Sequence, residues 1–292
     1  TDPRQLGALT VSMLRGTRGS QRKEVRRLCS HLAASSSPDV LVLTNVLIAG
    51  CVPELKAKLK CPVLVTLQGD DIFLDSLPEP HKSRAFEEIR RLSIEVDGFL
   101  THSRYYADYM ATYLRVPREK FHQVQLGIDV RDFASDDWEP RAATHQQPLS
   151  IGYLARIAPE KGLHNLVDAF IQLRQMPQTE DTRLTIAGWL GQHHRAYADQ
   201  QLEKLRCAGL LDSVEMSTSV DRAKKLEMLR QIDLLSVPTT YQEPKGIYVL
   251  ESLAAGVPVV QPAHGIFPEL IQSTGGGKLV PPENPELLAA AL

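Results

Sequence analysis

Short runs of apolar and β-branched residues alternate with longer segments of helical pattern along the first part of the chain. The runs at residues 39–44, 62–67 and 98–101 have the length of buried strands, and a fourth is predicted at 123–126. The helical segments are residues 20–34, 49–60, 79–96 and 103–114. Because helix-length segments separate the strands, the pattern predicts βαβ units and a parallel sheet.

The same alternation resumes after a polar stretch. Residues 134–148 contain two prolines and many polar side chains, which is typical of a linker between domains. Beyond it, strands are predicted at 149–154, 183–187, 214–216, 234–237 and 258–260, and helices at 160–175, 195–208, 221–231, 246–255 and 267–272. We therefore predict an α/β protein with two Rossmann-like, doubly wound domains, residues 1–140 and 141–292, that face a cleft. In such sheets, ligands bind at the carboxyl ends of the strands.

Composition narrows the function classes. The chain has 292 residues, 43% of them hydrophobic and 23% charged, with a net charge of −2. This balance is that of a globular protein and gives no reason to expect a nucleic-acid partner. No apolar run approaches the ~20 residues of a membrane span, and no signal peptide is visible. The cysteines have neither disulfide-motif nor zinc spacing, which predicts free thiols in a reducing compartment: Cys29, Cys51, Cys61 and Cys207.

The two ends of the sequence look cut. The chain begins at Thr1 without a methionine, and it stops at Leu292 inside an apparent helix that starts at Pro285. We expect both ends of a longer protein to be missing, which leaves an N-terminal anchor open.

A cluster of charged residues follows the first strand of the second domain. The segment from Arg156 to Gly162 reads RIAPEKG, with a proline and a glutamate at the expected start of a helix. Arg156 and Lys161 would lie beside the exposed amides of that helix end, where two cations form a site for a diphosphate. Taken alone, the segment is also consistent with ordinary solvated surface charges. The P-loop pattern GxxxxGK[ST] does not occur, and no GxGxxG follows a strand, which argues against a dehydrogenase.

Two glutamates flank the start of another predicted helix. Glu243 lies in the loop before it, Gly246 at its beginning and Glu251 inside it. Glutamates at this spacing can accept hydrogen bonds from the ribose and hexose hydroxyls of a nucleotide sugar, and a glycine lets backbone amides approach the phosphates. The alternative is a helix cap with a surface glutamate, because 35 acidic residues produce such spacings by chance.

Glycines lie at the boundaries of the helices and strands that follow. Gly256 is predicted to cap a helix before a strand that starts at Pro258. Gly265, which precedes a helix containing Glu269, is a second candidate nest of amides. Residues 275–277 are three glycines, which predicts a turn.

Together, these motifs resemble the C-terminal domain of glycosyltransferase family 4, whose members have the GT-B fold and are mostly retaining. The ordered set R-x-x-P-E-K-G, E-P-x-G-x-x-x-x-E, A-x-G-x-P-V-V and G-x-x-P-E carries the resemblance, which extends from about Asp39 to Leu292. In the first domain, residues 67–71, Ser103 and residues 126–129 are similar to landmarks of the same family.

The resemblance implies a role for each motif residue. Arg156 and Lys161 would bind the donor diphosphate, and Glu243 would hold sugar hydroxyls near the reacting carbon. Glu251 would hold the ribose. The donor would also contact the backbone at Gly246, Ile247, Tyr248 and Val249. No metal or other cofactor is expected, because the cations and helix ends take the charge of the departing nucleoside diphosphate.

The chain departs from the family at several positions. Gln68 stands where many members carry a histidine near the sugar, and glutamine can hydrogen-bond but does not titrate. With Gly69, Asp70 and Asp71 it is placed on the acceptor side of the cleft. For the two aspartates the alternatives are a helix cap and a metal-binding pair. Other departures replace a common glycine, glycine and phenylalanine: Ala155, Thr218 and Lys245.

The sequence therefore predicts a metal-independent enzyme that moves a hexose-type sugar from a nucleoside diphosphate sugar to a hydroxyl acceptor with retention. The acceptor is a sugar, a lipid-linked sugar or a small molecule, as in polysaccharide or glycoconjugate biosynthesis. A cytoplasmic location is expected, with peripheral contact to the inner face of the membrane left open. The alternatives are a non-catalytic sugar-nucleotide-binding domain and a sugar-nucleotide epimerase or phosphorylase of the same fold.

Overall fold

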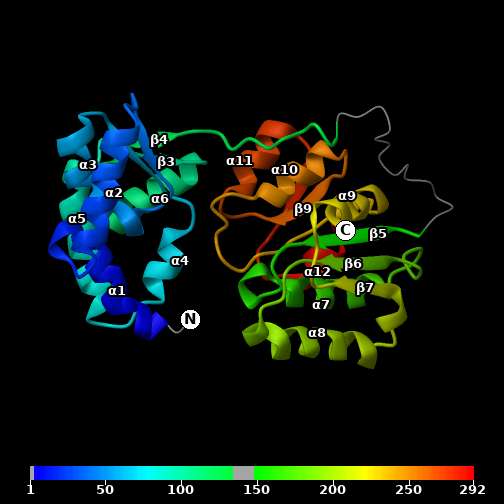
Figure 1. Cartoon of the computed structure of the whole chain (residues 1–292). Helices are drawn as coiled ribbons and strands as arrows, with labels where there is room; N and C mark the ends of the chain where they lie inside the picture. The colour runs from blue at the N-terminus through cyan, green and yellow to red at the C-terminus, as the bar shows by residue number, and fades with distance from the viewer. Residues whose placement is uncertain (1–2, 134–147) are drawn as a thin grey trace. The chain divides into compact units, whose positions relative to one another are not determined.

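The computed structural model describes residues 3–133 and 148–292, and the chain divides into two compact units, Thr1–Gln125 and Leu126–Leu292. Figure 1 shows the elements of each unit. The predicted domain boundary at residue 140 and most of the predicted linker lie outside the described residues.

The first unit is built on a four-stranded parallel sheet in the order β1-β2-β3-β4. Its strands are β1 (Leu41–Leu43), β2 (Val63–Thr66), β3 (Gly98–Thr101) and β4 (Phe121–Gln123). Its helices are α1 (Pro3–Arg15), α2 (Arg22–Ser35), α3 (Val52–Leu59), α4 (Asp70–Asp75), α5 (His81–Glu95) and α6 (Arg104–Leu114). Short 3-10 turns cover Gly16–Arg18, Val46–Cys51 and Arg118–Lys120. Because α4 begins directly after β2, it places the polar loop at residues 68–71 at the carboxyl end of this sheet.

The second unit has a six-stranded parallel sheet in the order β10-β9-β8-β5-β6-β7. Its strands are β5 (Ser150–Leu154), β6 (Arg183–Ala187), β7 (Val214–Ser217), β8 (Leu234–Leu235), β9 (Val259–Pro262) and β10 (Gly277–Val280). Its helices are α7 (Leu163–Leu173), α8 (Arg195–Cys207), α9 (Arg222–Gln231), α10 (Ile247–Ala254), α11 (Phe267–Thr274) and α12 (Pro285–Ala289). Its 3-10 turns cover Pro159–Lys161, Gln192–His194 and Leu211–Ser213.

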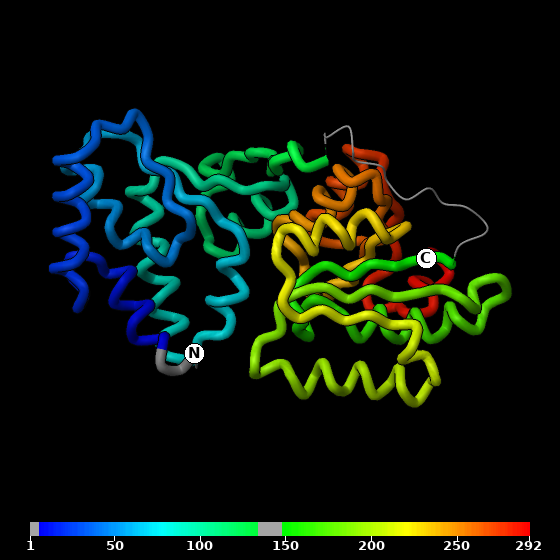
Figure 2. The backbone as a smooth tube through the Cα atoms, turned by 45° about the vertical axis from the view of Figure 1, so that its right-hand side comes forward, coloured from blue at the N-terminus to red at the C-terminus, as the bar shows by residue number. Residues whose placement is uncertain are grey.

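The chain of the second unit reverses its direction of travel across the sheet beside β5. Strands β6 and β7 lie on one side of β5, and β8, β9 and β10 on the other. Figures 1 and 2 show α7, α8 and α12 on one face of this sheet and α9, α10 and α11 on the other. Such a reversal separates the loops that follow β5 and β8, and the crevice between them is the usual ligand site of an open α/β sheet.

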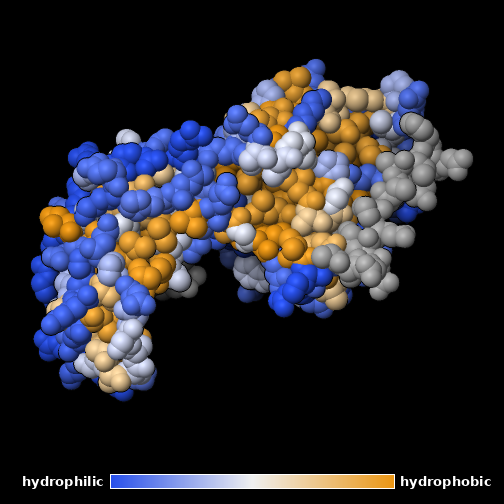
Figure 3. All heavy atoms as spheres, turned by 90° about the horizontal axis from the view of Figure 1, so that it is seen from above, coloured by the Kyte–Doolittle hydropathy of each residue, from blue (hydrophilic) through white to orange (hydrophobic). Residues whose placement is uncertain are grey.

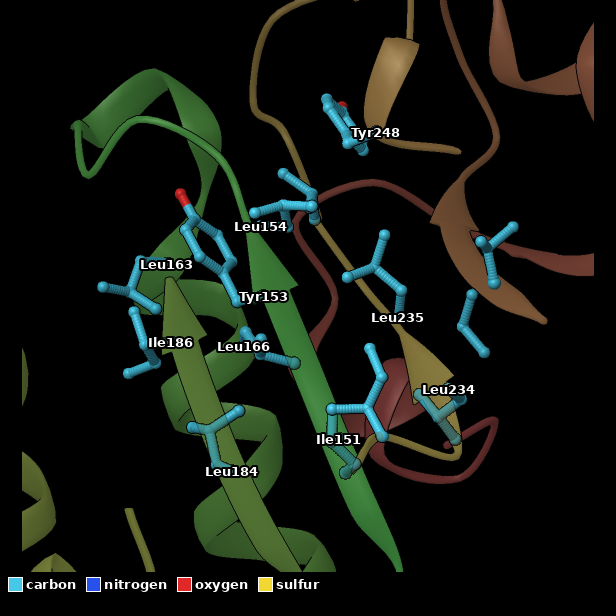
Figure 4. Close-up of a cluster of buried hydrophobic side chains, with 14 of the residues drawn as sticks. Ile151, Tyr153, Leu154, Leu163, Leu166, Leu184, Ile186, Leu234, Leu235 and Tyr248 are labelled. Carbon is cyan, nitrogen blue, oxygen red and sulfur yellow. The ribbon is translucent and has the colours of Figure 1, made fainter. Parts of the chain in front are cut away.

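An apolar core fixes β5 and the start of α7. Ile151 and Tyr153 of β5 pack with Leu184 and Ile186 of β6 and with Leu163 of α7, as Figure 4 shows, and each of the five is at most 1% exposed. Burying an apolar side chain of this size contributes about 1.5–3 kcal/mol. The loop that leaves β5 therefore starts from a rigid base.

The predicted α/β class with two parallel-sheet units is confirmed, with local corrections. The predicted strand at 123–126 lies earlier, at Phe121–Gln123, and the predicted helix at 160–175 begins only at Leu163. The sequence pattern does not predict α1, α4 or β10. The glycine run predicted to be a turn leads into β10, where Gly277 pairs with Val259. The charged Lys278 interrupts the apolar run of β10, so the segment lacks the continuous apolar pattern of a buried strand.

Candidate functional site

The turn that carries Lys161 is held tightly against the loop after β8. The 3-10 turn Pro159–Lys161 ends at Gly162, which has a φ of 73°. A Cβ atom at Gly162 would lie 1.7 Å from the carbonyl oxygen of Pro238, and the amide of Thr240 donates to the carbonyl of Glu160 at 3.0 Å. Only glycine permits this approach at this φ, so the contact brings Lys161 to the segment that holds Glu243. It also explains why α7 starts later than predicted.

Lys161 and Glu243 form a buried ion pair. The Lys161 Nζ lies 2.6 Å from the Glu243 Oε2, and the two side chains are 12% and 5% exposed. The ammonium also lies 4.8 Å from the ring centroid of Tyr241 and 5.6 Å from that of Tyr248. The cation is therefore surrounded by one carboxylate and two aromatic rings, an arrangement that stabilises its charge.

The surroundings keep Glu243 ionised. Burial alone would raise the pKa of Glu243, but the charge of Lys161 and the hydrogen bonds from Lys161 and Tyr241 outweigh it and hold that pKa below its ordinary value. The backbone of Glu243 is clamped as well, because its carbonyl accepts from the Ile266 amide at 2.9 Å. A Cβ at Gly265 would lie 2.6 Å from the Glu243 nitrogen, so packing against Glu243 accounts for this glycine.

The start of α10 adds backbone donors beside this pair. Gly246 takes a φ of 64° and precedes the first turn, as predicted, while Glu251 lies inside the helix. The first amides of a helix, here those of Ile247 and Tyr248, have no partner within it and attract anions. At α7, by contrast, the His164 amide donates to the Tyr197 hydroxyl at 3.0 Å. The α10 end is therefore the better candidate for a phosphate than the α7 end suggested by the sequence.

A pocket of about 480 Å³ is lined in part by Tyr248. Its lining comes from the loops after β5, β6 and β7 and from α9 and α10: Leu154, Ala155, Gly188, Trp189, Ser219, Val220, Asp221, Arg222, Lys225, Ile247, Tyr248 and Glu251. The Lys225 Nζ contacts the Glu251 Oε1 at 2.6 Å. The Tyr248 hydroxyl donates to Glu243 at 3.3 Å, so one residue joins the pocket to the buried ion pair.

Part of the pocket wall is apolar and exposed. Hydrophobic side chains reach the surface of the second unit on the face that Figure 3 shows. Among the pocket residues, Trp189 is 58% exposed and Ile247 is 38% exposed. Apolar and aromatic walls with a few charged groups are typical of a small-molecule site.

Arg156 lies in the loop between β5 and the turn that carries Lys161, and its side chain is more exposed than that of Lys161. Its side chain is 54% exposed, and its guanidinium contacts Glu160 at 3.1 Å. Its carbonyl accepts from the Tyr153 hydroxyl at 3.1 Å, so its backbone is fixed while its side chain extends into solvent. The four charged residues singled out from the sequence thus gather around the loops after β5 and β8 and the start of α10.

Comparison with known proteins identifies the family. The family described as "Glycosyl transferases group 1" matches residues 135–292, which is more than half of the chain. The chain belongs to the group 1 glycosyl transferases. The α/β architecture with two parallel-sheet units is likewise that of glycosyl transferase structures with the GT-B fold.

Individual relatives cover different shares of this chain. It is 29% identical over 182 residues to the putative colanic acid biosynthesis glycosyltransferase WcaL of Escherichia coli, covering 60% of this chain and 42% of that protein. It is 29% identical over 243 residues to the amylovoran biosynthesis glycosyltransferase AmsK of Erwinia amylovora, covering 82% of this chain and 56% of that protein. The chain thus spans about half the length of these curated relatives.

Solved structures show the same fold. HepE of Anabaena in complex with UDP has a TM-score of 0.73 at 18% identity, and the match covers 94% of this chain and 72% of HepE. The apo form of the lipopolysaccharide outer core galactosyltransferase WaaB has a TM-score of 0.65 at 15% identity, covering 93% and 69%.

In the first unit, the loop predicted to lie on the acceptor side is hydrogen-bonded within its own unit. Asp70 is 5% exposed and accepts from the amides of Val46 at 2.8 Å and Gln68 at 3.0 Å. Asp71 accepts from the Tyr106 hydroxyl, which in turn accepts from the Gly69 amide at 2.8 Å. Burial raises the pKa of both aspartates. Both lie in the first turn of α4, but the residue at the N-cap is Gly69 and no side-chain cap hydrogen bond is made there, so neither aspartate is the predicted helix cap.

Within residues 3–133 and 148–292, no three histidine, cysteine, aspartate or glutamate side chains are grouped so as to hold a metal ion. The helices in these ranges include none that is long and apolar enough to cross a bilayer. All four cysteines are free thiols, three of them buried.

Four residues of the site were not predicted from the sequence. Gly188 and Trp189 follow β6 directly, and their place at the carboxyl end of a predicted central strand was the signal that could have found Trp189. Lys225 and Tyr241 lie in a helix and a loop without a motif, and only the structure brings them to Glu251 and Glu243.

Proposed function

We propose that this protein transfers a hexose-type sugar from a nucleoside diphosphate sugar to a hydroxyl acceptor, with the donor held by the second unit. One observation carries the proposal. The buried pair of Lys161 and Glu243 and the pocket beside Glu251 adjoin through Tyr248, around the loops after β5 and β8. A nucleoside diphosphate sugar has a phosphate chain with a sugar at either end. It therefore needs a cation for the phosphates and a carboxylate for the hydroxyls of each sugar.

Each group of the donor has a matching partner. The diphosphate would lie between Lys161 and the first amides of α10, and the exposed Arg156 side chain would reach it by leaving its contact with Glu160. Glu243 would accept hydroxyls of the transferred sugar and Glu251 those of the ribose. The nucleobase would occupy the apolar wall at Trp189. Because the cations and amides stabilise the negative charge of the leaving nucleoside diphosphate, we propose that the reaction needs no metal.

The finer assignment rests on the motif order. The spacing of Arg156, Lys161, Glu243 and Glu251 supports membership of glycosyltransferase family 4 and, with it, retention of configuration. HepE, a protein of the same fold, was solved with UDP and with UDP-glucose, which supports a nucleotide-sugar donor. The names of WcaL and AmsK refer to the biosynthesis of colanic acid and amylovoran. They support a sugar or lipid-linked sugar acceptor and a reaction on the cytoplasmic side.

Calorimetric titration tests the donor site. UDP, GDP, ADP and their sugars are titrated in buffer with a chelator, and one nucleotide series should bind. Glu251→Gln should weaken that binding about tenfold or more, as expected when a charged hydrogen-bond acceptor for the ribose becomes neutral. Glu203→Gln is the matched control, because Glu203 pairs with Arg206 on the exposed face of α8. Unchanged affinity in both Glu251→Gln and Lys161→Met would refute the site.

Binding without turnover is a second candidate function. Gln68 favours it, because the Gln68 Nε2 donates to the Thr44 carbonyl at 2.8 Å and glutamine offers no titratable group where the family often has histidine. Incubation with the donor that binds and a panel of sugar acceptors separates the two. Release of nucleoside diphosphate together with a glycosylated product supports transfer, and NMR of that product gives the anomeric configuration. Binding with neither product supports the second candidate, and an altered donor sugar indicates an epimerase.

A further inference from the structure

The Tyr241 hydroxyl closes a ring of three polar atoms at the buried ion pair. It accepts a hydrogen bond from the Lys161 Nζ at 2.5 Å and donates one to the Glu243 Oε2 at 2.6 Å. The lysine and glutamate atoms are themselves 2.6 Å apart. A tyrosine hydroxyl can donate one hydrogen bond and accept others, so it can bridge a cation and an anion at the same time.

Other partners of Glu243 hold it less closely. The Tyr248 hydroxyl and the Lys245 amide both lie 3.3 Å from its carboxylate oxygens. Short hydrogen bonds to a charged group are the strong ones. Tyr241 therefore provides the main neutral contact that sets the direction of this carboxylate.

We propose that Tyr241 is a positioning residue for sugar transfer, whose hydroxyl fixes Lys161 and Glu243 at one distance and orientation so that phosphate and sugar hydroxyls meet a rigid pair. The proposal rests on the proposed function. The ring and the hydroxyl of Tyr241 have separate tasks. The ring faces the Lys161 ammonium at 4.8 Å, whereas the hydroxyl alone contacts Glu243. Removing the hydroxyl and keeping the ring thus isolates the positioning effect.

The acid side of the reaction's pH profile reports on the same contact. The charged or titratable groups around Glu243 are Lys161, Tyr241, Tyr248 and His264. The Lys161 charge and the hydrogen bonds of Lys161 and Tyr241 lower the pKa of Glu243 against the effect of burial. Loss of the Tyr241 hydroxyl should therefore raise that pKa, so that activity is lost at a higher pH on acidification.

The experiment compares Tyr241→Phe with Tyr197→Phe, which loses a hydroxyl that accepts from the His164 amide at 3.0 Å and touches neither Lys161 nor Glu243. The kinetics use the donor and acceptor that the titration and the acceptor panel select. The kcat of Tyr241→Phe should be reduced about 10- to 100-fold, the effect of one hydrogen bond to a charged group. The Kd for the donor should stay within about threefold, and the acid limb of the kcat profile should move to higher pH. Tyr197→Phe should change kcat by no more than about threefold.

The outcomes separate the two proposals. A wild-type chain that neither binds nor turns over any nucleotide sugar refutes the proposed function and this role with it. An active wild type with an unchanged kcat and acid limb in Tyr241→Phe refutes the positioning role alone. A Kd that weakens in proportion to the loss of kcat also overturns it, because the hydroxyl would then bind the donor directly.

Discussion

Two buried carboxylates, one in each unit, are held in opposite ways. Glu243 is 4% exposed and faces the ammonium of Lys161, whereas Asp70 is 5% exposed and accepts its hydrogen bonds from the amides of Val46 and Gln68. Burial tends to raise the pKa of both carboxylates. The Lys161 charge nevertheless leaves the pKa of Glu243 lowered, while the pKa of Asp70 is raised.

The difference shows what a buried carboxylate needs in order to stay ionised. Two backbone amides satisfy the oxygens of Asp70 but do not offset its lost hydration, whereas a full positive charge at 2.6 Å does so for Glu243. The group in the second unit is thus suited to accept hydroxyls of a bound sugar at neutral pH. The group in the first unit is suited to shape the loop before α4.

The largest expected effect comes from breaking the charged pair. Lys161→Met keeps the length of the side chain but leaves Glu243 buried without its cation, which should lower the free energy of unfolding by about 3–5 kcal/mol. Urea unfolding at neutral pH measures this loss. The double variant Lys161→Met/Glu243→Gln should recover part of it, because no uncompensated charge remains. A loss below about 1 kcal/mol in the single variant would show that the pair is not a stabilising unit.

A smaller effect is expected where the backbone, rather than charge, builds the site. Gly162→Ala should cost about 2 kcal/mol or more, because alanine at a φ of 73° is strained and its Cβ would lie 1.7 Å from the Pro238 carbonyl oxygen. Gly209→Ala is the matched control. Gly209 has a φ of 70° with no atom within 4 Å of the added Cβ, so it should cost only about 1 kcal/mol. Equal losses in the two variants would contradict a packing role for Gly162.

Sequence patterns predicted most elements of the sheets, because parallel strands and their helices are long enough to show their period. The strand Arg183–Ala187 and the helix Ile247–Ala254 lie where expected. The pattern did not predict α1 or α4. The six-residue helix Asp70–Asp75 is too short to show a helical period, although a helix cap is among the roles predicted for its two aspartates.

The candidate site was predictable where motifs carry it and not where the fold assembles it. Glu243, Gly246 and Glu251 lie around the start of one helix, as their spacing indicated. The pairing of Lys161 with Glu243 joins residues 82 positions apart and depends on the close approach of Gly162 to Pro238. Tyr241 has no signal of its own. Its role follows only from three atoms that meet in space.

In the first unit, loss of a tyrosine hydroxyl should lower the free energy of unfolding by less than the changes at Lys161 and Gly162. Tyr106 is 1% exposed, and its hydroxyl accepts from Gly69 and donates to Asp71. Tyr106→Phe should lower the free energy of unfolding by about 1–2 kcal/mol, since a buried amide and carboxylate lose a partner. Tyr113→Phe, which loses a contact to the exposed Asp75, should cost less than about 1 kcal/mol. Thermal and urea unfolding of the pair decide whether the Gly69–Asp71 loop depends on Tyr106, and a neutral Tyr106→Phe would show that it does not.

The smallest effect separates the two carboxylates by the sign of their pH dependence. Glu243 has a lowered pKa, so its stabilising contribution is present above its unfolded value, ~4.3, and is lost as pH falls through the folded pKa. Asp70 has a raised pKa, so the folded state gains stability as pH falls from above that pKa toward the unfolded value of ~3.9. Each slope is at most about 1.4 kcal/mol per pH unit.

Charge-neutral variants expose these slopes, because each removes a single titration. The stability difference between wild type and Glu243→Gln should shrink on acidification, whereas that between wild type and Asp70→Asn should shift in favour of the wild type. Unfolding free energies at a series of pH values from neutral to about 2.5, with identical ionic strength, measure both differences. Parallel curves for the two variants would mean that Lys161 does not distinguish Glu243 from Asp70. The proposed electrostatic difference between the two carboxylates would then be wrong.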